Sequence, residues 1–212
     1  MGDLLTRRRG LILASGAPRE WDYEWSYSSG KYPDQEGWTK TTGGTASVAF
    51  TNGYMVTTVT DTASYVKWTY PQAYSKAVLQ VGFRLTTNKA ALVRVFLGDG
   101  VSSSIGVRAN YSSGKHYLYL QDGSTTDTMT RLGAFEYAKT YQLKLVLDNG
   151  FGEVWWRNST DGADWSRVAS NVDCSTMQQN ETHETFFRAQ ANGSGATKVN
   201  WYTAYMKFNR VS

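Results

Sequence analysis

Three acidic side chains at alternate positions near the start of the chain could perform acid–base chemistry. They are Glu20, Asp22 and Glu24, and alternate residues of a strand project from one face. Retaining glycoside hydrolases use two carboxyl groups about 5–5.5 Å apart, one as nucleophile and one as acid/base. The same pattern is typical of a solvent-facing edge strand whose other, aromatic face packs on a core. We favour the second interpretation, and a hydrolase would depend on Glu20 and Glu24.

Aromatic side chains outside the expected core could instead bind sugars. Sugar rings stack on flat aromatic surfaces while nearby polar groups bind their hydroxyls. Trp155 fits this role because it lies on the polar face of its expected strand, and Trp38 and Tyr54 lie in or beside expected loops. The alternative is that Trp155 packs beneath a loop or a second sheet, as most aromatic side chains do. Trp155, Trp38 and Tyr54 are therefore the candidate glycan-binding residues.

Oxygen ligands for a hard cation flank one expected hairpin. They are Asp148, Asn149, Asp161 and Asp164, and Ca²⁺ takes six or more oxygen ligands. Such residues more often cap turns of their own backbone, so we expect no cofactor, with Ca²⁺ as the alternative. The two histidines lie far apart without a zinc-ligand spacing, and no serine lies in a nucleophile-elbow motif.

The elements that must position these residues are strands, and the clearest is a hairpin over residues 140–156. Residues 141–147 alternate apolar and polar side chains, apart from Val146, which is the period of a half-buried strand. Asn149 and Gly150 tolerate the positive φ that a tight hairpin turn needs. The returning strand places Trp155 on the polar face. A lone hairpin is only marginally stable, so a second sheet should cover its leucine face.

The rest of the composition also favours strands. The 212 residues include 8 Trp, 14 Tyr and 8 Phe, many Gly and few Pro, and the single cysteine excludes an intrachain disulfide. We expect further strands at about 21–28, 45–50, 54–60, 64–70, 77–86, 91–97, 102–109, 115–121, 128–132, 165–169, 182–191 and 198–208. About a dozen short strands without a convincing helix predict an all-β sandwich or jelly roll in one domain.

Three motifs make this body resemble the concanavalin A-like lectin and glucanase fold, the class of laminin G-like domains. They are the strand 77–86, the hairpin 141–156 with its L-x-L-x-L-D-x-G and x-V-x-W strands, and the S-x-D-G turn 159–162 followed by Trp165. The resemblance implies a concanavalin A-like jelly-roll β-sandwich over residues 19–212. Members of this class bind glycans, hydrolyse them or serve as structural modules. The E-x-D-x-E pattern of one glucanase family lies mid-chain, whereas here it opens the body.

Residues 1–18 form a separate basic and then apolar unit that ends in Ser-Gly-Ala-Pro. The stretch MGDLLTRRRGLILASGAP resembles the leader of phage and prophage tail, fibre and appendage proteins. That resemblance implies an arm that binds other virion proteins. Its expected contact residues are Leu4, Leu5, Arg7, Arg8, Arg9, Leu11 and Ile12, with apolar groups buried and arginines paired with oxygens of a neighbour.

These observations together predict a non-enzymatic phage structural protein, such as a tail fibre, appendage or head decoration. It would be made in the host cytoplasm, lie on the virion surface as a homo-oligomer, and bind host surface glycans through its lectin-like body. The alternatives are a free carbohydrate-binding module or lectin and, third, a glycoside hydrolase. The net charge of +4 is too mild to indicate nucleic acid, and no apolar run is long enough to span a membrane.

Overall fold

The computed structural model describes residues 23–26, 33–51, 54–71, 74, 76–86, 91–98, 104–112, 115–121, 130–174, 184–191 and 195–209. Strands make up almost all of these residues, and the one helical element is a short 3₁₀ turn, η1 (Pro33–Glu36). The strands are β1 (Tyr23–Ser26), β2 (Thr39–Gly43), β3 (Ala46–Thr51), β4 (Tyr54–Val59), β5 (Tyr65–Pro71), β6 (Lys76–Leu85), β7 (Ala91–Gly98), β8 (Ser104–Ser112), β9 (Lys115–Gln121), β10 (Thr130–Phe135), β11 (Thr140–Asp148), β12 (Phe151–Asn158), β13 (Ser166–Asp173), β14 (Glu184–Ala191) and β15 (Thr197–Asn209).

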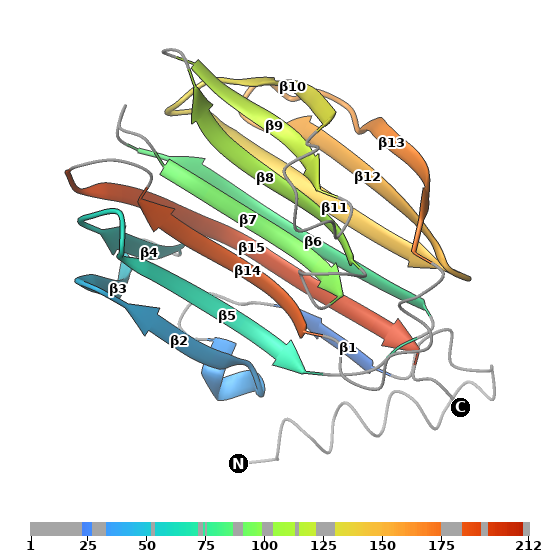
Figure 1. The fold of residues 1–212 in the computed structure, drawn as a ribbon, viewed down its shortest axis with the longest axis horizontal. Helices are drawn as coiled ribbons and strands as arrows, with labels where there is room; N and C mark the ends of the chain where they lie inside the picture. Colours follow the sequence, from blue (N-terminus) through green and yellow to red (C-terminus); the bar gives the residue numbers. More distant parts are fainter. Residues whose placement is uncertain are drawn as a thin grey trace.

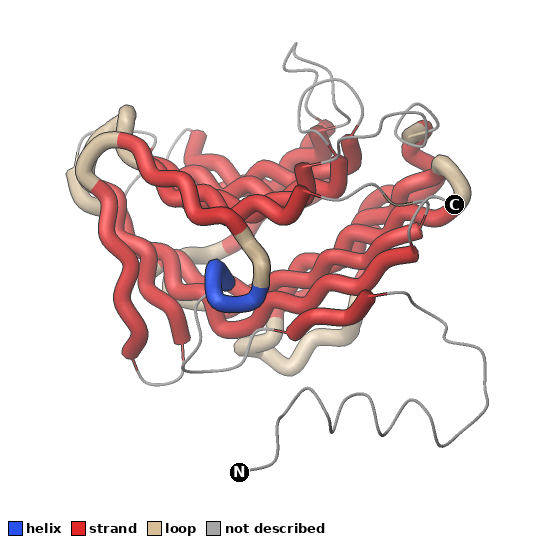
Figure 2. Tube along the Cα trace, turned by 90° about the horizontal axis from the view of Figure 1, so that it is seen from below, coloured by secondary structure: helices blue, strands red, loops and turns tan. Residues whose placement is uncertain are grey.

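The strands form two antiparallel sheets stacked face to face (Figures 1 and 2). Sheet A has the order β13-β12-β11-β6-β15-β4-β3, and β1 pairs with the far end of β15. Sheet B has the order β10-β9-β8-β7-β14-β5-β2. Many neighbours within a sheet are distant in sequence, as in β14, which lies between β7 and β5. No helix in the described part of the chain is long and apolar enough to cross a membrane.

The core lies between the two inner faces because alternate residues of each strand are apolar. On β11, Tyr141, Leu143, Leu145 and Leu147 are buried and the intervening residues are half-buried on the outer face. Residues of β7, β8 and β14 supply the opposing layer, among them Val95, Ile105 and Phe187. The leucine face of the hairpin is therefore covered by a second sheet, as its sequence predicts.

The predicted hairpin turn is confirmed. Asn149 and Gly150, the two central residues, have φ values of 49° and 79°, the signature of a type I′ turn. The strand β2 was not predicted, because its sequence TKTTG shows no apolar alternation and its first four residues are exposed. It occupies the edge of sheet B beside β5, where a polar strand can form through backbone pairing alone.

Candidate functional site

A cluster of tryptophan and basic side chains lies on the outer face of sheet A, over β11, β12 and β13. Its members, called here the tryptophan–cation cluster, are Trp155, Trp165, Lys144, Arg157 and Arg167. The register pairs Lys144 with Trp155 on one side, and Trp155 with Arg167 on the other. Outward positions of an antiparallel sheet meet their cross-strand neighbours directly, so the sheet itself assembles this cluster.

An irregular step in the register brings Arg167 into position. Val154 pairs with Ala169, but the next residue, Trp155, pairs with Arg167, so Val168 is left without an opposite residue. Such a bulge re-aims the side chains that follow it. It puts a guanidinium beside the indole of Trp155 where unbroken pairing would put a valine.

The cluster alternates cations and aromatic rings. The Lys144 Nζ lies 4.7 Å from the ring centroid of Trp155 and 5.0 Å from that of Trp165. The guanidinium of Arg167 lies 5.5 Å from the Trp155 ring, and that of Arg157 lies 4.8 Å from the Trp165 ring. Each of these distances is within the range of a cation–π interaction. One ammonium thus bridges two half-buried tryptophans.

Two polar side chains hold the cluster in place. Glu153 accepts a hydrogen bond from Trp155 Nε1 at 2.9 Å and one from Arg167 Nη1 at 3.1 Å. Gln142 accepts a hydrogen bond from Arg157 Nε at 2.8 Å. Because each long side chain already has a partner, less side-chain entropy remains to be lost when a ligand binds.

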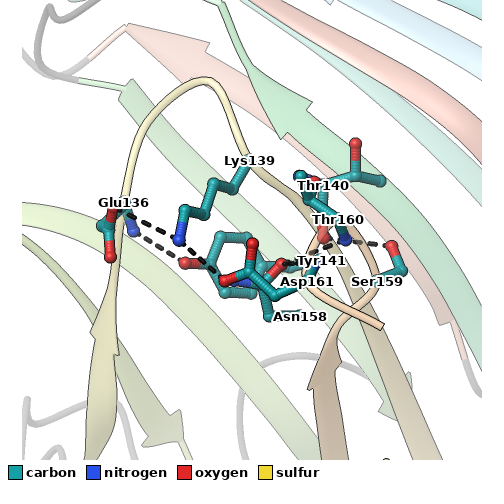
Figure 3. A network of polar contacts seen from close by, with 8 residues as sticks. All are labelled: Glu136, Lys139, Thr140, Tyr141, Asn158, Ser159, Thr160 and Asp161. Atoms are coloured by element: carbon teal, nitrogen blue, oxygen red, sulfur yellow. Dashed lines mark hydrogen bonds and ion pairs between the residues drawn. The ribbon is translucent and has the colours of Figure 1, made fainter. Parts of the chain in front are cut away.

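The turn between β12 and β13 leads into Trp165, and Figure 3 shows the contacts of this turn with Thr140. Ser159 donates to the Thr140 carbonyl through both its backbone N–H at 2.9 Å and its Oγ at 3.0 Å. Thr160 Oγ1 accepts a hydrogen bond from Thr140 N–H at 2.7 Å. Gly162 has a φ of 68°, which favours glycine over other residues. The S-x-D-G motif therefore fixes the approach of the chain to Trp165.

A second set of contacts in Figure 3 ties this turn to the β10–β11 turn. Asp161 Oδ2 accepts hydrogen bonds from Lys139 Nζ at 2.7 Å and from Asn158 Nδ2 at 2.8 Å. The hydrogen bond to Asp161, the largest cause, raises the pKa of Lys139. Desolvation raises the pKa of Tyr141, whose Oη accepts a hydrogen bond from Glu136 N–H at 2.8 Å. These groups hold one another, so we assign the network a structural role.

The structure corrects the prediction for Trp38. Its side chain is only 2% exposed, and its ring packs against Tyr70 at 5.5 Å and Phe187 at 5.4 Å between centroids. The residue follows η1 and closes one side of the core. A ring buried in this way cannot present a face to a sugar. Its packing partners could not be predicted from the sequence.

Tyr54 lies on the outer face of sheet A but away from Trp155. It packs against Tyr202, with ring centroids 5.0 Å apart. The sheet order places β15, β6 and β11 between its strand and β12. At about 4.8 Å between neighbouring strands, the two residues are roughly 19 Å apart. Of the three predicted glycan-binding residues, the structure therefore brings none together with another.

The candidate calcium ligands are also separated. Asp148 and Asn149 lie at one end of β12 and Asp161 and Asp164 lie beyond the other, and eight residues of strand span about 26 Å. They cannot surround one ion. Asp148 contacts Lys76 at 3.4 Å and Asp161 contacts Lys139 at 2.7 Å. No group of three His, Cys, Asp or Glu residues suited to a metal occurs in the described ranges.

The remaining predicted residues lie outside the described part of the chain. This holds for Glu20 and for the arm residues Leu4, Leu5, Arg7, Arg8, Arg9, Leu11 and Ile12. The backbone of Glu24 is in β1, paired with Lys207 of β15. The predicted edge strand therefore exists, and the acid–base hypothesis for Glu20 and Glu24 stays a prediction.

Most members of the tryptophan–cation cluster were not predicted from the sequence. Trp165 was noted only as part of a motif, and Lys144 only as one of the alternating polar residues of its strand. One signal was available, because the hairpin turn fixes the pairing of Lys144 with Trp155. The contribution of Arg167 depends on the bulge and had no sequence signal.

The sequence matches no protein-family model, and no curated protein is significantly similar to it. The fold resembles solved lectins. Lectin II from Ulex europaeus matches with a TM-score of 0.67 and 14% identity, over 90% of this chain and 100% of that chain. A lectin from Bauhinia forficata in complex with GalNAc matches with a TM-score of 0.59 and 11% identity, over 90% and 100% of the two chains. These likenesses and the two antiparallel sheets confirm the predicted concanavalin A-like jelly-roll sandwich.

A sialidase also matches, with a TM-score of 0.62 and 14% identity over 88% of this chain. The matching region is only 18% of that chain. The fold thus occurs both as a whole lectin and as a small part of a larger enzyme. Fold alone does not assign an activity.

Proposed function

We propose that the chain is a non-enzymatic carbohydrate-binding module and that it binds glycans on the tryptophan–cation cluster. One observation carries the proposal: Trp155 and Trp165 lie on an outer sheet face, bridged by Lys144 and bordered by hydrogen-bonding side chains. The fold supports it, because similar solved structures are lectins crystallised with galactose, GalNAc or a fucoside.

The chemistry of the cluster suits a sugar better than an apolar ligand. The indole rings offer flat apolar surface, while Lys144, Arg157 and Arg167 offer charged donors and Glu153 offers acceptor oxygens. A site with an aromatic base and converging polar groups is typical of a small-ligand site. A sugar would take the place of one cation over a ring, and that cation would then donate to a sugar hydroxyl.

The cluster does not offer the pair of carboxyl groups that glycoside hydrolysis needs. Glu153 is its one carboxylate, and both of its oxygens accept hydrogen bonds. Acid–base catalysis on a sugar uses two carboxyl groups about 5–9.5 Å apart. Binding without turnover is therefore the activity that we propose for this face.

The test is calorimetric titration of the full chain with methyl α-D-galactoside, N-acetylgalactosamine and methyl α-L-fucoside. We expect Trp155→Ala to lower the affinity for the sugar that binds about tenfold, since one stacked ring contributes about that much. Tyr54→Ala is the matched control, because it removes an aromatic ring from the same outer face without touching the cluster. Binding of none of the sugars, or equal binding by Trp155→Ala, would contradict the proposal.

We also propose, from the leader sequence alone, that residues 1–18 attach the module to a phage particle as a homo-oligomeric surface component. The support is the likeness of the LLTRRR stretch to phage and prophage structural proteins. Electron microscopy of particles formed with the full chain and with residues 19–212 tests it. Equal incorporation of both chains would count against the arm, and a free lectin would then be the better description.

A further inference from the structure

The outer face of sheet B carries a row of basic side chains in direct register. Lys67 of β5 pairs with Arg188 of β14, Arg188 pairs with Arg94 of β7, and Arg94 pairs with Arg108 of β8. These four residues, called here the basic row, occupy four adjacent strands (Figure 1). At about 4.8 Å between strands, the row extends roughly 14 Å.

No acidic residue occupies a position within this register. The row continues to Thr41 of β2 beyond Lys67, and to Tyr119 of β9 beyond Arg108. Like charges directly opposite one another destabilise a sheet. The register therefore sets three pairs of like charges side by side, and it gathers four cations on one line across the sheet.

The four basic side chains are half-buried rather than fully solvated, and aromatic rings lie against two of them. The Arg188 guanidinium lies 4.1 Å from the ring centroid of Tyr65, and Lys67 Nζ lies 4.5 Å from that of Phe186. Burial lowers the pKa of Arg188, because desolvation disfavours its charged form. An anion placed over the row would offset that cost.

The described aromatic rings beside the row already pack against other side chains. Phe186 stacks on Phe96 with centroids 4.8 Å apart and carries Lys67 over its ring. The ring of Tyr65 carries Arg188. Binding of single-stranded nucleic acid depends on open aromatic faces on which bases stack. The rings described beside the row are thus already covered by a cation or by each other, which favours a polyanion that does not need stacking.

We propose that the basic row binds a linear polysaccharide with a carboxylate on successive sugars, which lies across β5, β14, β7 and β8. Successive carboxylates would reach cations of successive strands, and each arginine can bind a carboxylate through two parallel hydrogen bonds. The regular spacing of the strands then selects a regular polyanion. This site goes beyond the proposed sugar site and is independent of it, since the two lie on opposite faces of the sandwich.

The test uses polygalacturonate as the probe, with neutral dextran and a deoxythymidine oligonucleotide as the other arms, by affinity electrophoresis of the full chain at two salt concentrations. We expect the chain to bind polygalacturonate, to bind it more weakly at the higher salt concentration, and to ignore dextran. The double variant Arg94→Gln, Arg188→Gln should bind about a hundredfold more weakly, because it removes two charged donors and each lost hydrogen bond to a charged group contributes about tenfold.

The matched control is Lys198→Gln, Lys207→Gln, which removes the same charge from positions on sheet A that register with Thr58 and Val78. It should change the affinity less than about twofold, as should Trp155→Ala. The double variant Arg94→Lys, Arg188→Lys keeps the charge and replaces the glutamine variant in the test if that variant does not fold. Its affinity for polygalacturonate should be intermediate, because lysine cannot form two parallel hydrogen bonds to a carboxylate. Tighter binding of the oligonucleotide, salt-independent binding, or equal loss in the control would overturn the proposal.

Discussion

Both outer faces of the sandwich gather basic side chains, but only sheet A interleaves them with tryptophan. On β11, β12 and β13 the register runs from Lys144 to Trp155 to Arg167, so each cation faces an aromatic ring. On β5, β14 and β7 the register runs from Lys67 to Arg188 to Arg94, so each cation faces another cation. The same sheet geometry thus produces mutual stabilisation on one face and mutual repulsion on the other.

The two faces differ in whether contacts within the folded chain account for their basic side chains. In the tryptophan–cation cluster, Glu153 and Gln142 accept hydrogen bonds from Trp155, Arg167 and Arg157, and Lys144 faces two indole rings. The cluster could exist for stability alone, and a ligand must compete with contacts that are already made. In the basic row each cation has a like charge as its cross-strand neighbour, so a ligand of opposite charge would relieve that repulsion.

The largest expected effect is a loss of stability when the core shared by the two sheets is disrupted. Leu145 is fully buried between the sheets, beside Lys144 on the same strand. Leu145→Ala should lower the free energy of unfolding by about 2–5 kcal/mol, since it removes buried methyl groups and leaves a cavity. Chemical denaturation measures this change. A loss below about 1 kcal/mol would show that the core beneath the cluster is not as tightly packed as in the structure.

The next effect concerns the aromatic pair beside the basic row. A Cβ added at Gly106 would lie 2.2 Å from Cδ1 of Phe96, the ring that stacks on Phe186. Gly106→Ala should therefore displace that ring and lower the free energy of unfolding by about 1–3 kcal/mol. Gly133→Ala is the comparison variant and should cost less, because its added Cβ would lie 3.1 Å from Cζ2 of Trp156, which need move by only a few tenths of an ångström. Equal melting temperatures for wild type and Gly106→Ala would rule out the stacked pair.

Local pattern predicted much of this fold, because strand alternation and hairpin turns are encoded by neighbouring residues. The turn at Asn149 and Gly150 needed only the intrinsic tolerance of those residues for positive φ. The basic row could not be predicted in this way. Its members come from β5, β7, β8 and β14, and only the sheet order makes them neighbours. The prediction that Trp38 binds glycans was wrong for the same reason, since the residues that bury it, Tyr70 and Phe187, lie far from it in the sequence.

Removing one cation from each face should then change stability unequally. Lys144→Gln removes contacts to two indole rings and should cost about 1–2 kcal/mol. Arg188→Gln removes one favourable ring contact, but it also removes the repulsion between Arg188 and its two like-charged neighbours. Its net effect on the free energy of unfolding should therefore be within about 0.5 kcal/mol. Thermal unfolding at low salt measures both. A larger loss of stability for Arg188→Gln than for Lys144→Gln would contradict the proposed difference between the two faces.

The smallest expected effect is a loss of stability in alkaline solution, which reports on the turn that places Trp165. The pKa of Lys139 is raised above its ordinary value of 10.5, chiefly by its hydrogen bond to Asp161. A raised folded-state pKa gives stability that is fully present below the unfolded pKa and is lost as pH rises through the folded one. The raised pKa of Tyr141, which starts from 10.0, acts in the same direction.

Stability should therefore fall slightly above about pH 10, because the folded chain keeps protons that the unfolded chain has released. Asp161→Asn removes the carboxylate that holds Lys139 and should make the alkaline fall shallower. The contribution of Tyr141 is reduced only slightly, because burial is the main cause of its raised pKa and the charge of Asp161 is a minor one. Denaturation midpoints measured from pH 8 to pH 11 decide this. The same slope in both proteins would mean that the contact between Lys139 and Asp161 does not persist in solution. The turn before Trp165 would then depend on its other hydrogen bonds, among them those of Ser159 and Thr160 to Thr140.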